Sequence, residues 1–374
     1  MRNAEWWLPV ANKRPTLKRV TRDDVAKRAR TSTAVVSYVV NGGPRSVAQH
    51  TQDRVNAAIE ELGYRPNGLA RALRANRTLV LGLLVPDAKN PFFAQFAKAV
   101  EDVAFSQGFT LLFGNASDDP ERESFYLKSF SEQQIDGLLL MSVGGGTKSS
   151  DELDRLHCRL VVVDRLLANL ETTTLVVDNE EGGFLGTRHL IEHGHRVIGC
   201  VSGPTDLTPS ADRHRGWARA LREAALDPLP SLIVRSDHHQ LGGYEATRTL
   251  LQSENPPSAI FVSTDIQAIG SLRAVVDAGL SVPDDVAIVS FDGIVESAYT
   301  VPGLTTIAQP IEELGRTAMA KLIELVRDPD AKTTNEVLPV KLIVRGSCGC
   351  RDDSLVDLTL RNDAAAGVSE FSLT

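Results

Sequence analysis

Residues 20–41 constrain the fold most, because they carry the start signals of two short helices joined by only about three residues. Thr21 followed by Asp24 is the pattern of a helix N-cap, and Ser32 can cap a second helix. Apolar residues recur at helical spacing after each cap. Two short helices whose apolar sides face each other are typical of a helix-turn-helix. A helical hairpin inside an ordinary core would give the same pattern.

The next stretch separates these two interpretations. A third helical pattern covers residues 55–62 and ends at Gly63, and residues 64–74 then read YRPNGLARALR. The combination of T-x-x-D-V-A-x-x-A, S-x-x-x-V-S-x-V-x-N and G-Y-x-P-N-x-x-A-x-x-L resembles the DNA-binding headpiece and hinge of LacI/GalR-type bacterial repressors. This resemblance implies a helix-turn-helix headpiece over residues 17–64 and a hinge over residues 65–77.

Charge is segregated along the chain. Residues 1–77 carry 15 Lys or Arg and 6 Asp or Glu, whereas residues 78–374 carry 25 and 42. A compact basic segment is the electrostatic footprint of a protein that binds phosphates. The acidic remainder should be repelled by DNA.

The sequence does not predict a membrane protein or a disulfide framework. Apolar runs stay shorter than the roughly 18 residues of a membrane span. Residues 1–16 lack the apolar segment of a signal peptide, so we expect a disordered leader and a cytoplasmic protein. The four cysteines are few and scattered. Cys348 and Cys350 have no second ligand cluster nearby in the sequence, so we expect neither a metal site nor a cofactor.

From residue 78 the pattern changes to buried strands that alternate with helices. Such alternation predicts doubly wound parallel sheets, here in two lobes like those of periplasmic binding proteins. Ligands bind such sheets at the carboxyl ends of the strands, which places the site between the lobes. The resemblance implies a two-lobed effector-binding and dimerisation domain over 78–350, in which the segment after the second lobe returns to the first: lobe 1 at 78–177 and 306–345, and lobe 2 at 178–305. We expect a disordered tail at 351–374.

The resemblance also implies which residues contact DNA. Thr33, Ala34 and Tyr38 stand at the positions that read the major groove, although Ala34 offers only a methyl group and Tyr38 replaces a frequent arginine. Leu73 in the hinge stands where the family inserts a wedge into the minor groove, and the alternative is a linker with a core leucine. The candidate DNA-binding residues are Thr21, Thr33, Ala34, Ser37, Tyr38, Asn41, Asn67, Leu73 and Arg74. Arg30 stands where the family often has glycine.

Polar and aromatic side chains follow several of the predicted strands. Arg213 matches the family's cleft arginine in S-x-x-R-x-x-G, where a guanidinium suits hydroxyl or carboxylate oxygens. Aromatic rings can stack on a sugar or a purine, or they pack in an interface. The candidate ligand-binding residues are Phe92, Phe93, Asp164, Arg165, Arg213, His238, Thr264, Asp265, Asp292 and Gln309.

These observations predict a sequence-specific transcriptional repressor that binds double-stranded operator DNA as a homodimer, with a higher oligomer as the alternative. The expected effector is a sugar, and a purine or another small molecule is the alternative. An enzyme or a ligand-binding protein on the same α/β scaffold is the competing hypothesis. The run at 144–149 lacks the glycine spacing of a phosphate loop, and we find no nucleophile elbow, so we predict no enzymatic activity.

Overall fold

The computed structural model describes residues 20–41, 46–65, 77–144, 152–153, 155–165, 167, 170–328 and 330–350. Contacts between Cα atoms divide the chain into two compact units, residues 1–78 and 79–374. The predicted leader, most of the predicted hinge and the predicted tail lie outside the described residues, as do the candidate DNA-binding residues Asn67, Leu73 and Arg74.

The described residues of the first unit form three helices around a small core. They are α1 (Arg22–Arg28), α2 (Thr33–Asn41) and α3 (Gln49–Leu62). The predicted helix signals are confirmed: Thr21 and Asp24 form a capping box, the Ser32 hydroxyl accepts from the backbone N–H of Val35, and Gly63 ends α3 with φ +61°. The core residues come from all three helices and the turn after them: Val25, Ala26, Ala29, Val36, Val55, Ala58 and Tyr64.

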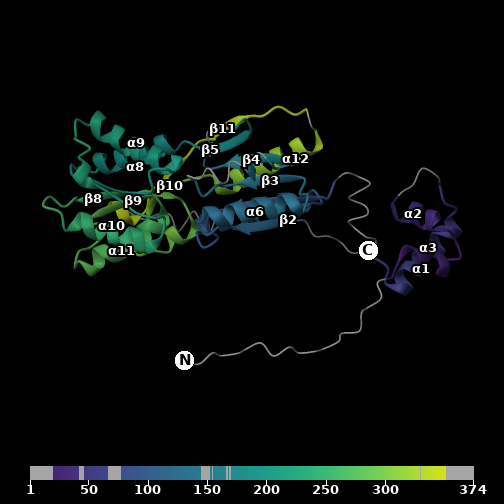
Figure 1. Ribbon diagram of the computed structural model, residues 1–374. Helices are drawn as coiled ribbons and strands as arrows, with labels where there is room; N and C mark the ends of the chain where they lie inside the picture. Colours follow the sequence, from purple (N-terminus) through teal and green to yellow (C-terminus); the bar gives the residue numbers. More distant parts are fainter. Residues whose placement is uncertain are drawn as a thin grey trace, which may run out of the picture. The chain divides into compact units, whose positions relative to one another are not determined.

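The described residues of the second unit form two six-stranded sheets, each covered by helices on both faces (Figure 1). The first sheet has the order β11-β5-β4-β3-β1-β2 and is parallel throughout. Helices α5 and α12 pack on one face and α6 on the other. The elements are β1 (Val80–Val85), α5 (Pro91–Ser106), β2 (Thr110–Asn115), α6 (Pro120–Glu132), β3 (Gly137–Leu140), β4 (Arg159–Val163), β5 (Thr173–Val177), α12 (Ile311–Arg327) and β11 (Asn335–Leu338).

The second sheet has the order β12-β10-β9-β8-β6-β7, and only its edge strand β12 is antiparallel. Helices α8 and α9 cover one face and α10 and α11 the other (Figure 1). The elements are α8 (Asn179–Glu192), β6 (Ile198–Ser202), α9 (Thr208–Glu223), β7 (Ile233–Arg235), α10 (Gln240–Leu251), β8 (Ala259–Val262), α11 (Asp265–Asp277), β9 (Ala287–Asp292), β10 (Thr305–Ala308), β12 (Lys341–Ile343) and the 3₁₀ helices η1 (Pro230–Leu232), η2 (Val295–Ala298) and η3 (Gly346–Cys348).

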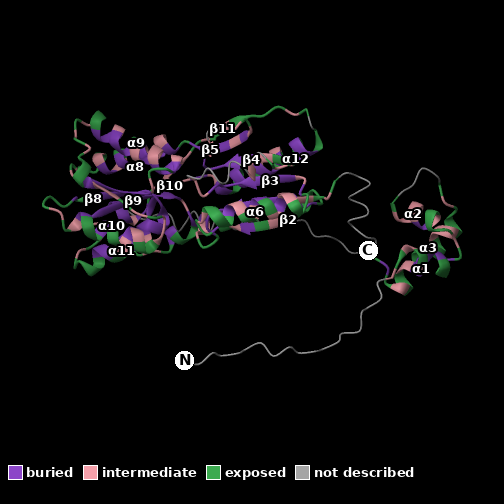
Figure 2. Cartoon of the chain, viewed as in Figure 1, coloured by how far each residue is buried: buried purple, intermediate pink, exposed green. Residues whose placement is uncertain are grey.

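Strands of both sheets are apolar along most of their length because helices exclude water from both faces. Figure 2 shows this buried layer, with exposure confined mainly to the outer helix faces and the loops. None of the helices among the described residues is long and apolar enough to cross a membrane.

The predicted lobe boundaries were wrong at the C-terminal end. We expected residues 306–345 to return to lobe 1, but β10 and β12 both belong to the second sheet, and only α12 and β11 return. The chain therefore crosses between lobes three times, after β5, after β10 and after β11. Pro339 directly follows β11, at the point where the chain leaves the first sheet.

Candidate functional site

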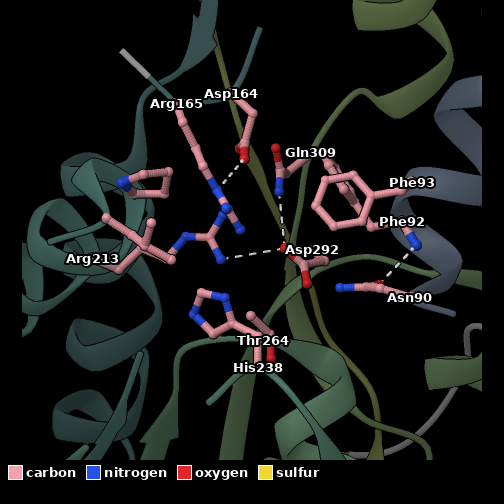
Figure 3. A pocket seen from close by; sticks show the side chains of 12 residues that line it. Asn90, Phe92, Phe93, Asp164, Arg165, Arg213, His238, Thr264, Asp292 and Gln309 are labelled. Atoms are coloured by element: carbon pink, nitrogen blue, oxygen red, sulfur yellow. Dashed lines mark hydrogen bonds and ion pairs between the residues drawn. The ribbon is translucent and has the colours of Figure 1, made fainter. Parts of the chain in front are cut away.

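A small cavity lies between the two lobes, at the carboxyl ends of the strands (Figure 3). Nine of the ten candidate ligand-binding residues line it, and Asn90, Leu207 and Pro209 were missed by sequence reasoning. The lining consists of Asn90, Phe92, Phe93, Asp164, Arg165, Leu207, Pro209, Arg213, His238, Thr264, Asp292 and Gln309.

Asp292 and Arg213 form the centre of the site. Asp292 ends β9 with φ +124°, and Arg213 lies on α9. The Arg213 Nη1 donates to Asp292 Oδ1 at 3.3 Å, and Gln309 Nε2 donates to the same oxygen at 2.9 Å. Two further contacts fix the Arg213 side chain: its Nε donates to Asn179 Oδ1, and its guanidinium lies 3.7 Å from the centre of the Phe291 ring. The guanidinium is therefore fixed before a ligand arrives.

Burial controls the charge of Asp292. Removal from water raises its pKa to about 7, and Asp265 and Asp164 add to the rise, while the Arg213 guanidinium and the Gln309 amide oppose it. This carboxyl group therefore changes protonation near neutral pH and offers either an acceptor or a donor to a ligand.

A second ion pair lies beside the first one. Asp164 follows β4 with φ +69°, and its Oδ2 lies 3.7 Å from Arg165 Nε. Burial raises the pKa of Asp164 and lowers the pKa of Arg165, while their mutual attraction opposes both shifts. Arg165 also donates to the Ser142 carbonyl at 2.8 Å, which leaves its other nitrogens available at the cavity.

The first lobe contributes an amide and two aromatic rings from the start of α5. The Asn90 Oδ1 caps this helix by accepting from the Phe92 N–H at 3.0 Å, so its amide nitrogen is left to point toward the cavity (Figure 3). The rings of Phe92 and Phe93 lie edge to face, with centroids 5.2 Å apart. Asn90 could have been found from its sequence, because an N-cap before proline is a recognisable helix start.

The second lobe supplies the remaining walls. Burial, with Arg165 and Arg213 nearby, lowers the pKa of His238 to about 3, so its imidazole is neutral and can hydrogen bond as donor and acceptor. Its Nε2 lies 3.1 Å from the Ser210 hydroxyl. Leu207 and Pro209, at the start of α9, add an apolar surface to the cavity. No polar motif in the sequence predicted these two residues.

The prediction of Asp265 as a ligand-binding residue was wrong, because Asp265 does not line the cavity. Its carboxylate accepts from the Ser290 and Thr306 hydroxyls and from the N–H groups of Gly293 and Ile294, at 2.5–2.9 Å. The side chain is fully buried. Its lone pairs are therefore used within the protein, and it fixes the segment that directly follows Asp292.

In the first unit, α2 presents the predicted DNA-reading face to the surface. Thr33, Ala34 and Asn41 are exposed, and Ser37 and Tyr38 are partly buried. The Asn41 amide donates to the Ser37 carbonyl and hydroxyl at 3.0 and 3.2 Å. Thr21 is exposed but its hydroxyl already takes part in the cap of α1.

A three-helix headpiece and a two-lobed unit with a buried polar cavity together define a transcription regulator that is controlled by a small ligand. Comparison with known proteins agrees. The family of bacterial regulatory proteins called lacI matches residues 21–67, and the periplasmic binding protein-like domain matches residues 187–348.

The relatives extend this match over most of the chain. The HTH-type transcriptional repressor PurR of Aliivibrio salmonicida (strain LFI1238) is 39% identical over 309 residues, which are 82% of this chain and 92% of that protein. The lac repressor dimer bound to operator and the anti-inducer ONPF has a TM-score of 0.80 at 26% identity, covering 88% of this chain and 99% of that one. The transcriptional regulator CelR in complex with cellobiose has a TM-score of 0.68 at 29% identity, covering 88% and 100%.

The chain therefore belongs to the LacI family of bacterial regulatory proteins. It is a DNA-binding transcriptional repressor whose activity a small-molecule effector controls. The predicted family and fold class are confirmed.

Proposed function

We propose that the effector is a sugar or another small polyhydroxylated compound, bound by the residues that line the interlobe cavity. The observation that carries this proposal is the distribution of polar groups: carboxyl, guanidinium, amide and imidazole groups surround the cavity on several sides, whereas the aromatic rings come from α5 alone (Figure 3). Hydroxyl groups project from a sugar ring in many directions and both donate and accept, which matches such a lining.

One buried atom supports the same assignment. Gln309 Oε1 has no hydrogen-bond partner within the described part of the chain, although Gln309 lines the cavity. A buried carbonyl oxygen without a partner costs free energy that a ligand donor recovers. A ligand hydroxyl is a suitable donor for it.

A purine is the second candidate. The Phe92 and Phe93 rings can stack on a flat base, and Asp292 and Asn90 can pair with its ring nitrogens and exocyclic groups. The two candidates are separated by isothermal titration of the full-length protein with pentoses, hexoses, disaccharides, hypoxanthine and guanine. Binding of a purine with no sugar response would overturn the sugar assignment, and loss of binding in Asp292→Ala would support the site.

We also propose how the effector controls DNA binding. The cavity is lined from both lobes, so a ligand that contacts both favours their closed arrangement. This change reaches the paired headpieces of a homodimer and alters the affinity for operator DNA. Asp292→Ala should then retain operator binding in a gel shift while the ligand response disappears.

For the DNA itself, we propose that Thr33, Ala34 and Tyr38 contact bases, that Thr21, Ser37 and Asn41 act at the phosphates or the turn, and that Asn67, Leu73 and Arg74 form the hinge contact. The exposed positions on α2 and the match to the family support this assignment. Leu73→Ala should weaken specific binding much more than non-specific binding, and equal losses would contradict the wedge.

We propose no enzymatic activity, and a cytoplasmic location, because the relatives are repressors that act on DNA.

A further inference from the structure

A second cluster of reactive side chains lies in lobe 2, and none of its members lines the effector cavity. His189 and His193 come from the C-terminal end of α8, and Cys348 and Cys350 follow β12. One ligating atom from each residue lies within 4.8 Å of the other three. The Cys350 sulfur is 3.2 Å from His193 Nε2 and 3.9 Å from His189 Nε2.

The chain brings these four residues together by two local devices. His189 and His193 are four residues apart on one helix and share a face, with ring centroids 4.5 Å apart. Gly349 takes φ +92° between the two cysteines, a conformation that favours glycine. The sequence showed no second ligand pair near Cys348 and Cys350, because the histidines lie 157 and 161 residues earlier along the chain.

We propose that His189, His193, Cys348 and Cys350 bind a single Zn²⁺ ion. Two thiolates and two imidazole nitrogens are a characteristic donor set for tetrahedral zinc, whereas Mg²⁺ and Ca²⁺ prefer oxygen ligands. In such a site the ligand atoms are separated by about 3.4 Å between nitrogens to about 3.8 Å between sulfurs. The separations in this cluster, with an upper limit of 4.8 Å, come close to that tetrahedron.

The surroundings favour a cation at this place. The cluster lies at the C-terminal end of α8, where the helix dipole is negative. Cys348 is buried, and the Thr305 hydroxyl lies 3.1 Å from its sulfur, a position from which it supports a thiolate. His193 is exposed and Cys350 partly exposed, so the ion can enter from solvent.

The position of the ion indicates a structural role. It joins α8 to the segment that follows the last crossing between the lobes. This segment is otherwise held to lobe 2 by β12, which is only three residues long. At its other end α8 begins with Asn179, whose Oδ1 accepts from Arg213 in the effector cavity. Zinc would therefore fix both the end of lobe 2 and the helix that supports the cavity arginine.

The first test measures zinc in the full-length protein after gel filtration, by plasma mass spectrometry. We expect about one zinc ion per chain in the wild type. The variants Cys350→Ser and His193→Ala, which remove the two more exposed ligands, should hold less than about a tenth of that amount. Cys158→Ser and His195→Ala are matched controls, because Cys158 lies in lobe 1 and His195 pairs with Ser258. Both controls should keep the full zinc content.

The second test replaces zinc by Co²⁺ in the wild-type protein and so does not depend on the folding of a variant. Tetrahedral cobalt with thiolate ligands gives intense visible bands and a sulfur-to-metal charge-transfer band. Their appearance at one equivalent, with a chelator-reversible rise in Tm, supports the site. A folded protein without these bands, zinc retained in both ligand variants, or a Cys348–Cys350 disulfide in the purified protein would each overturn it.

Discussion

Both cavity aspartates occupy backbone conformations that residues with side chains rarely adopt. Asp164 has φ +69° and Asp292 has φ +124°, and each directly follows or ends a strand. Such conformations cost of order 1–3 kcal/mol and persist where the surrounding structure fixes them. Here the strain turns each carboxyl group from the sheet into the space between the lobes.

The raised pKa of Asp292 makes a stability prediction for the ligand-free protein. Its pKa is 3.8 in the unfolded chain and about 7 when folded, so the folded state retains a proton that the unfolded state has lost. Stability contributed by this proton is present below pH 4 and is lost as the pH rises toward 7. Asp292→Asn cannot ionise and should therefore become more stable than the wild type as the pH rises, by at most about 4 kcal/mol.

Urea denaturation at pH 4.5 and 7.5, followed by circular dichroism, measures this difference. Asp206→Asn is the control, because Asp206 is exposed near the same cavity wall. A stability difference between Asp292→Asn and the wild type that stays constant with pH would show that Asp292 is ionised throughout.

Sequence reasoning could place Asp292 in the site but could not exclude Asp265. Both follow or end a strand of the same sheet, and the hydroxyl and N–H groups that saturate Asp265 come from residues 25 to 41 positions away. The sequence showed that Arg30 stands where the family often has glycine, but only the structure shows why. Arg30 has φ +49°, a backbone conformation that glycine adopts more readily than other residues. Such facts depend on three-dimensional contacts that no local pattern contains.

At the scale of elements, α8 and α9 pack so closely that their backbones nearly touch. A Cβ atom added to Gly183 would lie 2.2 Å from the Arg213 carbonyl oxygen, and one added to Gly216 would lie 2.0 Å from the Glu180 carbonyl oxygen. Since backbone atoms cannot rotate away, any side chain must separate the helices. This contact sets the position from which Arg213 enters the cavity.

Gly183→Ala should therefore weaken both the fold and the site. We expect a loss of about 1–3 kcal/mol in stability from overpacking, despite the better helix propensity of alanine, and at least a tenfold loss in effector affinity. Gly186→Ala on the same helix is the matched control, because its Cβ would meet only side-chain atoms at 3.1 Å or more. Calorimetric titration and urea denaturation measure the two effects, and equal behaviour of the variants would contradict the argument.

The sequence predicted most elements because buried parallel strands and amphipathic helices have different periods. It failed at β10 and β12, which we expected to lie in lobe 1 but which pair in the second sheet. Neither short strand carries a local pattern that shows which sheet it joins, because its pairing depends on strands far away in the sequence. Local periodicity identifies a strand but not its neighbour.

At the scale of the whole ligand-binding unit, polar side chains also link the lobes outside the cavity. His239, before α10 in lobe 2, lies 4.0 Å from Asp87 and 3.7 Å from Asp118, both in lobe 1. Burial raises the pKa of Asp118, and Arg165 opposes that rise. Because these contacts join the two lobes, we expect them to favour the closed arrangement that we propose for the ligand-bound protein.

His239→Ala should shift the ligand-free protein toward the open arrangement. The contacts are long and His239 is 44% exposed, so the pair contributes at most about 1 kcal/mol, or about fivefold in population. The effector affinity should fall by up to the same factor if, as we propose, the effector binds the closed arrangement. Small-angle scattering should show a larger radius of gyration without ligand. The control is His157→Ala, an exposed histidine of lobe 1, and an unchanged radius with unchanged affinity would mean that the cavity residues alone hold the lobes together.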